Sequence, residues 1–126
     1  MSNADKKKSK SEQEMERWAK EVKRGAITLA VLALLNKKPA YGYEVVKDLE
    51  DRASFLQLEQ GTVYPILRRM EKRGLLSSEW DYQDPTKPKK YYRLTSEGRK
   101  ALRMMAMTWK VLSHEMQQIT REVGTQ

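Results

Sequence analysis

The chain has 126 residues, the size of one domain, and its 39% hydrophobic and 33% charged side chains exclude wholesale disorder. Lysine and arginine number 25 and aspartate and glutamate 17, so the net charge is +8 and the isoelectric point is near 9.7. The absence of cysteine excludes disulfide scaffolds, cysteine-ligated metals and thiol nucleophiles.

The first predicted elements are a basic arm and a helix. Residues 1–10 are rich in lysine and have no apolar periodicity, so we expect them to be disordered. Ser11, followed by Glu12 and Glu14, is typical of a helix start because carboxylates there stabilise the positive end of the helix dipole. The helix predicted over residues 11–24 has an apolar stripe at spacings of three and four. This stripe, which we expect to contribute to a dimer, consists of Met15, Trp18 and Val22.

The longest apolar run extends from Ala26 to Leu35, which is about half the length of a bilayer span. We therefore expect a central buried helix rather than a membrane segment, with Gly25 loosening the chain between it and the preceding helix. The residues at 36–39 (Asn-Lys-Lys-Pro) end this helix. Neither an apolar h-region nor a small-residue cleavage site precedes it, so the sequence predicts a cytoplasmic protein without membrane contact.

Two further helices follow. The first is predicted over residues 41–52, and after a linking turn over residues 54–60 the second extends to Arg73. The residues that the helix over 41–52 would bury are Val45, Val46 and Leu49.

Gly74 stands in the usual C-cap place of the second of these helices. Two positions are possible for the start of this helix. With Thr62 as N-cap, Pro65 lies in the first turn, where its missing N–H costs nothing. A start near Gln60 instead predicts a small distortion at Pro65.

The segments 75–82 and 90–94 are rich in aromatic and alternating residues and flank the turn-forming residues 83–89, which predicts a β-hairpin. Thr95 then caps a last helix, with Glu97 in its first turn. The order helix, helix, turn, helix, hairpin is that of a winged helix-turn-helix. The predicted fold is mainly α with a small β-hairpin, in which this domain spans residues 25–95.

The helix over residues 60–73 has two faces. On a helical wheel its core side is formed by Val63, Ile66, Leu67 and Met70. Its outward side is formed by Gly61, Pro65, Arg68 and Lys72, with Tyr64 and Arg69 on the shoulders. This face has small residues near the N-terminus of the helix and basic residues along its length, which suits insertion into the major groove of DNA. There the guanidinium of an arginine can bind guanine or a phosphate. The competing interpretation is an ordinary solvated Arg/Lys face.

The hairpin tip carries Lys87, Lys89 and Lys90, stiffened by Pro85 and Pro88. Ammonium groups on an ordered loop reach phosphates at low entropy cost, although hairpin tips are also lysine-rich for solubility alone. Tyr91 and Tyr92 point to opposite faces of their strand, so one is expected in the core and the other near the DNA backbone; which is which stays open.

Residues 96–126 are predicted to form a long dimerisation helix. Apolar residues recur there at alternating spacings of three and four: Leu102, Met105, Trp109, Leu112, Met116, Ile119 and Val123. This heptad seam is too long for so small a body to cover, so we expect a homodimer built by both terminal helices. The alternative is that the helix packs back on its own domain. Met105, Trp109 and Trp18 could also line a pocket for a small aromatic effector, with plain interface packing as the competing interpretation.

An enzyme is not expected. The single histidine, His114, lies on the outward side of the seam helix, and the chain has no second histidine, no cysteine and no Gly-rich phosphate loop. No metal site, catalytic residue or cofactor is therefore predicted.

Three segments carry a resemblance: residues 41–44 (Tyr-Gly-Tyr-Glu), residues 61–76 (Gly-Thr-Val-Tyr-Pro-Ile-Leu-Arg-Arg-Met-Glu-Lys-Arg-Gly-Leu-Leu) and residues 89–98 (Lys-Lys-Tyr-Tyr-Arg-Leu-Thr-Ser-Glu-Gly). Over about residues 25–112 the chain closely resembles the PadR family of transcriptional regulators. The resemblance implies a dimeric winged-helix protein, usually a repressor, that binds a palindromic operator. It also implies that the C-terminal helix dimerises, and that an aromatic residue near Trp109 lines a drug-binding pocket in some members.

The sequence thus predicts a sequence-specific, DNA-binding transcriptional regulator: a dimeric repressor released by a small-molecule effector. The alternatives are a dimeric winged-helix module that binds RNA or protein, and a nonspecific architectural DNA binder. The residues predicted to contact double-stranded DNA are Tyr41, Thr62, Tyr64, Pro65, Arg68, Arg69, Lys72, Lys87, Lys89, Lys90 and Tyr91. Of these, Tyr41 and Thr62 are implied by the resemblance alone.

Overall fold

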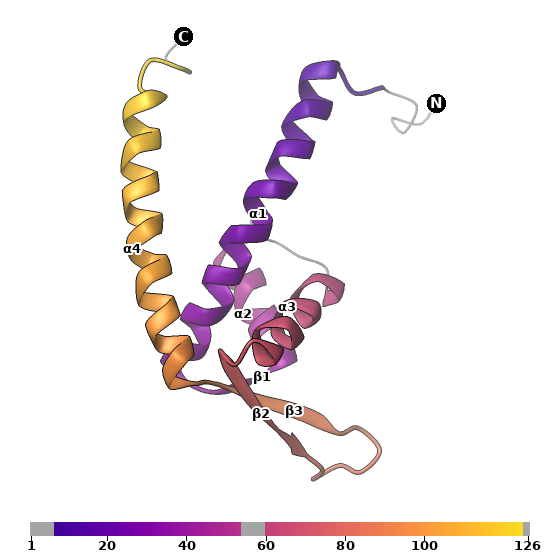
Figure 1. Ribbon diagram of the computed structural model, residues 1–126. Helices are drawn as coiled ribbons and strands as arrows, with labels where there is room; N and C mark the ends of the chain where they lie inside the picture. The colour runs from indigo at the N-terminus through magenta and orange to yellow at the C-terminus, as the bar shows by residue number, and fades with distance from the viewer. Residues whose placement is uncertain (1–6, 54–59, 125–126) are drawn as a thin grey trace.

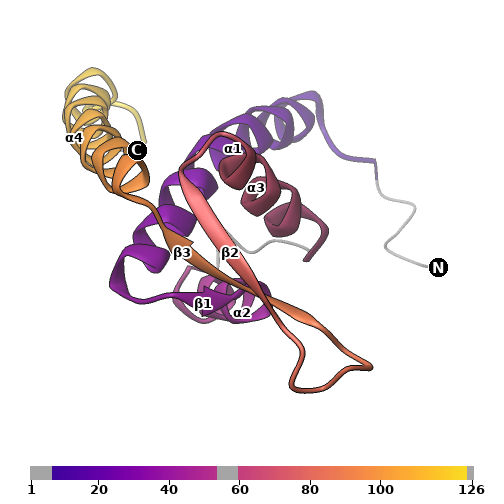
Figure 2. The ribbon, with the colours of Figure 1, turned by 60° about the horizontal axis from the view of Figure 1, so that its bottom comes forward.

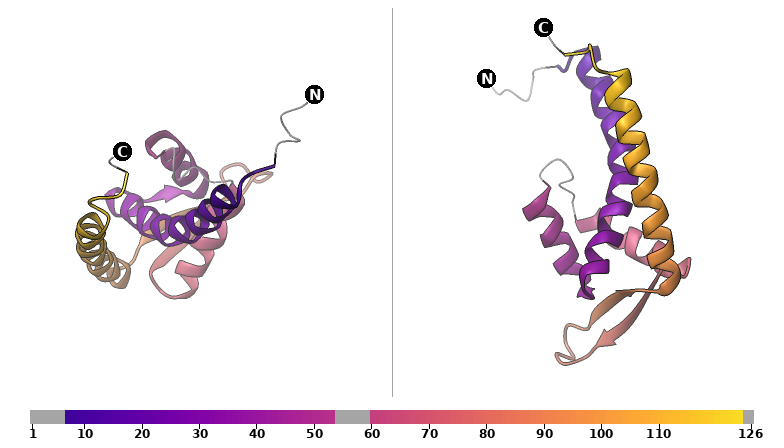
Figure 3. Two further views of the ribbon diagram at one scale, coloured as in Figure 1. Left: turned by 90° about the horizontal axis from the view of Figure 1, so that it is seen from above. Right: turned by 90° about the vertical axis from the view of Figure 1, so that its left-hand side faces the viewer.

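The computed structural model describes residues 7–53 and 60–124. In chain order they form α1 (Lys10–Lys37), β1 (Ala40–Tyr41), α2 (Gly42–Arg52), α3 (Gln60–Lys72), β2 (Leu76–Asp81), β3 (Lys89–Leu94) and α4 (Ser96–Ile119) (Figure 1). The body consists of α2, α3, the sheet and the C-terminal half of α1. From it the N-terminal half of α1 and most of α4 project (Figures 1 and 3). This is the predicted winged helix-turn-helix with long terminal helices.

One continuous helix replaces the two that the sequence predicts on either side of Gly25. A mid-helix glycine costs about 1 kcal/mol, and the strong helix formers on both sides outweigh that cost. The helix also begins before Ser11, because Ser9 is the N-cap. The Ser9 hydroxyl accepts from the Glu12 amide at 3.1 Å, and Glu12 accepts from the Ser9 amide at 2.9 Å. The predicted disordered arm of residues 1–10 lies mostly outside the described residues; within it, residues 7–9 have no regular structure and Lys10 is helical.

The sheet has the strand order β1-β3-β2, and both pairings are antiparallel. The hairpin of β2 and β3 confirms the prediction, with Leu76 opposite Leu94 and Trp80 opposite Lys90. The strand β1 is not predicted by the sequence, because two residues are too few to show a period. It takes up Tyr41, so α2 begins at Gly42, and it joins the start of α2 to the edge of the hairpin.

The helix α3 begins at Gln60, so Pro65 lies inside the helix rather than in its first turn. The linking turn predicted over residues 54–60 lies outside the described residues apart from Gln60. The C-terminus confirms the prediction: Gly74 has φ 82°, and the amides of Gly74 and Leu75 donate to the carbonyls of Glu71 (3.0 Å) and Met70 (2.9 Å). This pair of bonds is the Schellman motif, which turns the chain directly into β2.

The core lies between α1, α2, α3 and one face of the sheet. Its fully enclosed side chains are Ile27, Val31, Leu32, Val45, Val63 and Leu67. The buried face of α3 is the one that the wheel predicts, since Val63, Ile66, Leu67 and Met70 are all at most 4% exposed. The opposite face of the helix is therefore held outward by the packing of these four residues.

The helix α4 is anchored to the body only at its start. Thr95 is its N-cap, as predicted, and its hydroxyl accepts from the Gly98 amide and donates to the Gly74 carbonyl (3.0 and 2.7 Å). Leu102 is buried, and further along the helix the apolar seam is exposed: 43% at Trp109, 46% at Leu112 and 74% at Ile119. The start of the seam, Leu102 and Met105, packs on the chain's own domain, and the seam residues from Trp109 onward are exposed. No helix within residues 7–53 and 60–124 is long and apolar enough to cross a membrane.

Candidate nucleic-acid interface

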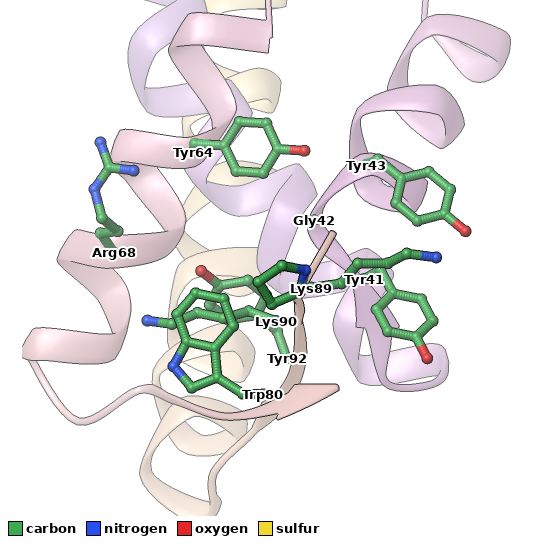
Figure 4. A pocket seen from close by; sticks show the side chains of 10 residues that line it. Tyr41, Gly42, Tyr43, Tyr64, Arg68, Trp80, Lys89, Lys90 and Tyr92 are labelled. Atoms are coloured by element: carbon green, nitrogen blue, oxygen red, sulfur yellow. The ribbon is translucent and has the colours of Figure 1, made fainter. Parts of the chain in front are cut away.

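An open cleft of about 400 Å³ separates α3 from the start of α2 and from the hairpin. We call it the aromatic cleft. Figure 4 shows the residues that line it: Tyr64 and Arg68 on α3, Tyr41 on β1, Gly42 and Tyr43 at the start of α2, Trp80 on β2, and Lys89, Lys90 and Tyr92 on β3. Rings line the cleft and three cations stand at its edges. Five residues predicted to contact DNA are thereby brought together: Tyr41, Tyr64, Arg68, Lys89 and Lys90.

The ring of Tyr64 packs directly on the start of α2. A β-carbon built on Gly42 would lie 2.5 Å from Cε1 of Tyr64, closer than any real side chain permits. The absence of a side chain at Gly42 therefore leaves room for the half-buried ring of Tyr64 between α3 and the start of α2. Arg68, one turn further along α3, is exposed, and Figure 4 shows its guanidinium on the other side of the helix from that ring. Arg68 has no ion-pair partner in the described part of the chain and can take two hydrogen-bond acceptors in its fork.

A hydrogen bond joins the helix-turn-helix to the hairpin. The Tyr41 hydroxyl donates to Oδ2 of Asp81 at 2.5 Å. This bond raises the pKa of Tyr41 to about 12 and holds the pKa of Asp81 below its usual value of 3.8, helped by the Gln83 amide. Tyr41 is thus a neutral donor at every physiological pH.

Lys89 is held over the same tyrosines. Its Nζ lies 5.3 Å from the ring centroid of Tyr41 and 5.4 Å from that of Tyr43, and these two rings stack at 5.8 Å with 12° between their planes. Cation–π contacts of this kind restrict an otherwise flexible lysine without neutralising its charge. Lys89 is therefore a preordered cation at the edge of the cleft.

Lys90 is held differently. Its ammonium lies 3.4 Å from Oε1 of Glu71 and 5.3 Å from the Trp80 ring centroid, and its side chain is 29% exposed. Glu71 also accepts from the Ser78 hydroxyl at 2.6 Å. Through these contacts Glu71 on α3 holds both strands of the hairpin. Lys90 therefore helps to join the hairpin to α3 and also lines the cleft.

The two neighbouring tyrosines of β3 point to opposite faces, which resolves the open question from the sequence. Tyr92 is in the core at 3% exposure, and burial raises its pKa. Tyr91 is on the other face, with its ring edge-on to Tyr41 at 5.0 Å between centroids. Tyr91 therefore packs against the ring of Tyr41 and does not line the aromatic cleft.

The other residues predicted to contact DNA lie elsewhere. Thr62, Pro65 and Arg69 line a separate groove between α3 and α1. Lys72 is exposed at the end of α3, and Lys87 is exposed in the hairpin loop, which is tightened by the bond from its amide to the Asp84 carbonyl at 3.0 Å. The helix α3 thus has the aromatic cleft on one side and a second groove on the other.

Sequence reasoning missed four residues of the cleft region: Gly42, Tyr43, Trp80 and Asp81. Pairing of β2 with β3 places Trp80 beside Lys90 and Asp81 beside Lys89. An alternating pattern predicts the hairpin but does not fix its register, and β1, which brings Tyr41 to Asp81, is too short to be predicted.

Of the residues predicted for the dimer and the effector pocket, Met15 and Trp18 on α1 are 53% and 58% exposed, and Trp109 on α4 is 43% exposed. Met105 is half-buried against the core. Within residues 7–53 and 60–124, no three histidine or acidic side chains form a group that could hold a metal ion.

Comparisons with known proteins agree with this architecture. Residues 31–104 match the Transcriptional regulator PadR-like family. The crystal structure of a PadR family transcriptional regulator from Eggerthella lenta is 38% identical, with a TM-score of 0.77 over 89% of this chain and 96% of that one. That of a PadR family transcription regulator from Clostridium difficile is 35% identical, with a TM-score of 0.65 over 74% and 96%.

An uncharacterised protein from Lysinibacillus sphaericus is 32% identical over 88 residues, which are 68% of this chain and 80% of that protein. The family match covers more than half of the chain and includes α2, α3 and the hairpin. The aromatic cleft and the exposed face of α3 therefore lie within the matched region. The chain belongs to the PadR-like family of transcriptional regulators.

Proposed function

We propose that the protein is a sequence-specific transcriptional repressor that inserts α3 into the major groove of its operator. The observation that carries the proposal is the outward face of α3, where Arg68 is exposed and without an ion-pair partner among the described residues, one turn along α3 from the half-buried Tyr64. An arginine fork of this kind reads guanine through two hydrogen bonds. Lys89 and Lys87 extend the same positively charged edge along the hairpin, where contacts go to phosphates.

The proposed repressor acts as a homodimer on a palindromic operator. The seam of α4 leaves four large apolar side chains 43–74% exposed: Trp109, Leu112, Met116 and Ile119. A continuous apolar surface of this kind is unfavourable in water and marks a surface that a partner covers. Two copies related by a two-fold axis along α4 present two copies of α3, which suits two half-sites of opposite orientation.

We further propose that a small planar aromatic effector binds at the dimer interface, between Trp109, Met105 and Trp18. Exposed indoles stack on planar rings and methionines adapt to ligand shape, and both features occur here. The experiment is a titration of the protein with planar aromatic compounds, following Trp fluorescence and DNA affinity, in the wild type and in Trp109→Ala. Trp18 emits from the proposed pocket as well, and Trp80 emits from the hairpin, so the double variant Trp18→Ala/Trp109→Ala is the decisive control. A quench that persists in the double variant would exclude this pocket.

The test of the main proposal uses one preferred duplex and one random duplex. Arg68→Ala should cost about 1–3 kcal/mol on the preferred duplex and reduce the preference over random DNA. Arg103→Ala, which removes an exposed arginine from α4, is the matched control and should change neither affinity. Equal losses on both duplexes would contradict the role of Arg68 as a base reader. Binding to structured RNA with none to DNA would instead favour the alternative winged-helix module.

A further inference from the structure

The second groove, on the side of α3 away from the hairpin, has a composition unlike that of the aromatic cleft. It has a volume of about 450 Å³ and lies between α3 and the middle of α1. Its basic side chains are Lys20, Lys23 and Arg24 from α1 and Arg69 from α3. None of the described side chains that line it is acidic.

The sequence of α1 aims these cations at α3. Lys20 and Arg24 are four residues apart, so they share one face of the helix, and Ile27 continues that face one turn further. Ile27 is 1% exposed in the core beside α3, which fixes the rotation of α1 about its axis. The apolar stripe with Trp18 lies on the opposite side of α1. The cationic face is therefore independent of the face that we assign to the dimer.

Three of the cations in this groove are uncompensated. Lys20, Arg24 and Arg69 form no ion pair with a carboxylate anywhere in residues 7–53 and 60–124. On the same helix Arg17, by contrast, is paired with Glu14. Unpaired cations that converge over an apolar floor focus a positive potential and favour a bound anion. The floor of the groove includes Pro65 and the buried Ile66. Apolar side chains of this kind can pack against a sugar ring, while the cations around them bind a phosphate.

We propose that this groove seats the sugar–phosphate backbone of the DNA strand on the side of α3 away from the hairpin. The inference rests on the proposed function, because it takes α3 to occupy the major groove. A helix in that groove has a backbone on each side of it. Figures 1 and 2 show the hairpin tip and the N-terminal half of α1 on the same side of the molecule, with the start of α3 between them. In this arrangement Lys89 and the hairpin contact the backbone of one DNA strand. Lys20, Arg24 and Arg69 contact the backbone of the other strand.

The experiment compares Lys20→Ala/Arg24→Ala with Lys100→Ala/Lys110→Ala, which removes two exposed charges from α4. Affinities for a preferred and a random duplex are measured by fluorescence anisotropy at several salt concentrations. Phosphate contacts carry no sequence information, so the α1 variant should lose affinity for both duplexes by the same factor, on the order of tenfold. The slope of log K against log salt should fall by about 0.9 for each phosphate that the variant no longer neutralises. The α4 variant should match the wild type.

Hydroxyl-radical footprinting of the wild type and the α1 variant gives a second readout. The wild type should protect a backbone segment flanking the bases read by α3, and Lys20→Ala/Arg24→Ala should lose that protection alone. Sedimentation of both variants checks that the oligomeric state is unchanged.

Three results would separate the possible failures. An α1 variant with wild-type affinity, salt slope and footprint, while Arg68→Ala is impaired, overturns this inference and leaves the proposed function standing. A wild type that binds no duplex overturns both. If the α1 variant lost binding to structured RNA but not to duplex DNA, the groove would belong to an RNA partner and the inference would be wrong.

Discussion

Gly98 and Leu75 are in backbone contact so close that a β-carbon on Gly98 would lie 2.1 Å from the Leu75 carbonyl oxygen. That oxygen already accepts from the Thr95 amide at 3.1 Å. The first turn of α4 is thereby fixed on the turn that ends α3. The direction of α4, and with it the position of any partner on α4, is thus set by the turn that ends α3.

Gly98→Ala should destabilise the fold by about 3 kcal/mol, because the clash is with main chain that cannot move aside. Gly25→Ala is the matched control. Nothing lies within 4 Å of its added β-carbon, and an alanine inside α1 should stabilise the protein by about 0.5–1 kcal/mol. Urea unfolding of both variants measures the two free energies. A Gly98→Ala variant as stable as the wild type would mean that α4 does not approach Leu75 in solution.

Glu71→Ala should loosen the hairpin from α3. It removes the acceptor of the Ser78 hydroxyl (2.6 Å) and the partner of Lys90 (3.4 Å), both only partly exposed, so a loss on the order of 1 kcal/mol is expected. Glu79→Ala is the control: its ion pair with Arg93 is mostly exposed, so its removal should change stability by less than about 0.5 kcal/mol. Equal effects in urea unfolding would show that Glu71 does not hold the hairpin.

Tyr41→Phe should raise the pKa of Asp81 towards its ordinary value, because the hydrogen bond from Tyr41 is the largest cause that lowers it. A carboxyl with a lowered folded pKa stabilises the fold above its unfolded pKa, and this contribution is lost as the pH falls through the folded value. When the pH is lowered from neutral to below 3.8, the free energy of unfolding should therefore fall more for the wild type than for Tyr41→Phe.

The carboxyl carbon of Asp81, followed by NMR from neutral to acid pH, gives this pKa directly. Tyr43→Phe is the control, since Tyr43 stacks on Tyr41 but its hydroxyl does not reach Asp81 in the described part of the chain. If Tyr41→Phe left the titration unchanged, the Gln83 amide and the nearby charge of Lys89 would account for the lowered pKa.

Leu112→Glu should convert the proposed dimer to a monomer, because it places a charge in the middle of the apolar seam of α4. Val111→Glu introduces the same charge at a position that is also exposed, 58% against 46%, but turned about 100° away from the seam. Sedimentation equilibrium should show monomers for the first variant and dimers for the second. Dimers for both would place the interface elsewhere.

The helices and the hairpin could be predicted because their signals are local. The 3.6-residue period of α3 identifies the buried face from Val63 to Met70, and Gly74 marks its end. Gly25 misled the prediction because a local penalty of about 1 kcal/mol is small beside the helix-forming tendency of the flanking segments.

The aromatic cleft could be predicted only in part. Tyr64 and Arg68 follow from the wheel of α3, whereas the contact of Tyr41 with Asp81 joins residues 40 apart. That contact depends on the two-residue strand β1 and on the register of the hairpin, which a pattern along the chain does not specify. For the same reason the basic groove between α1 and α3 is not visible in the sequence: Lys20 and Arg69 meet only once α1 is known to be continuous.

Sequence-specific recognition of DNA is tested most directly by the affinity of the wild type for the DNA just upstream of its own gene, against a random duplex of equal length, at two salt concentrations. A preference of about a thousandfold or more, with affinity for both duplexes falling steeply as salt rises, is the expected result. Equal affinity for the two duplexes, set by salt alone, would contradict it and favour a nonspecific architectural binder.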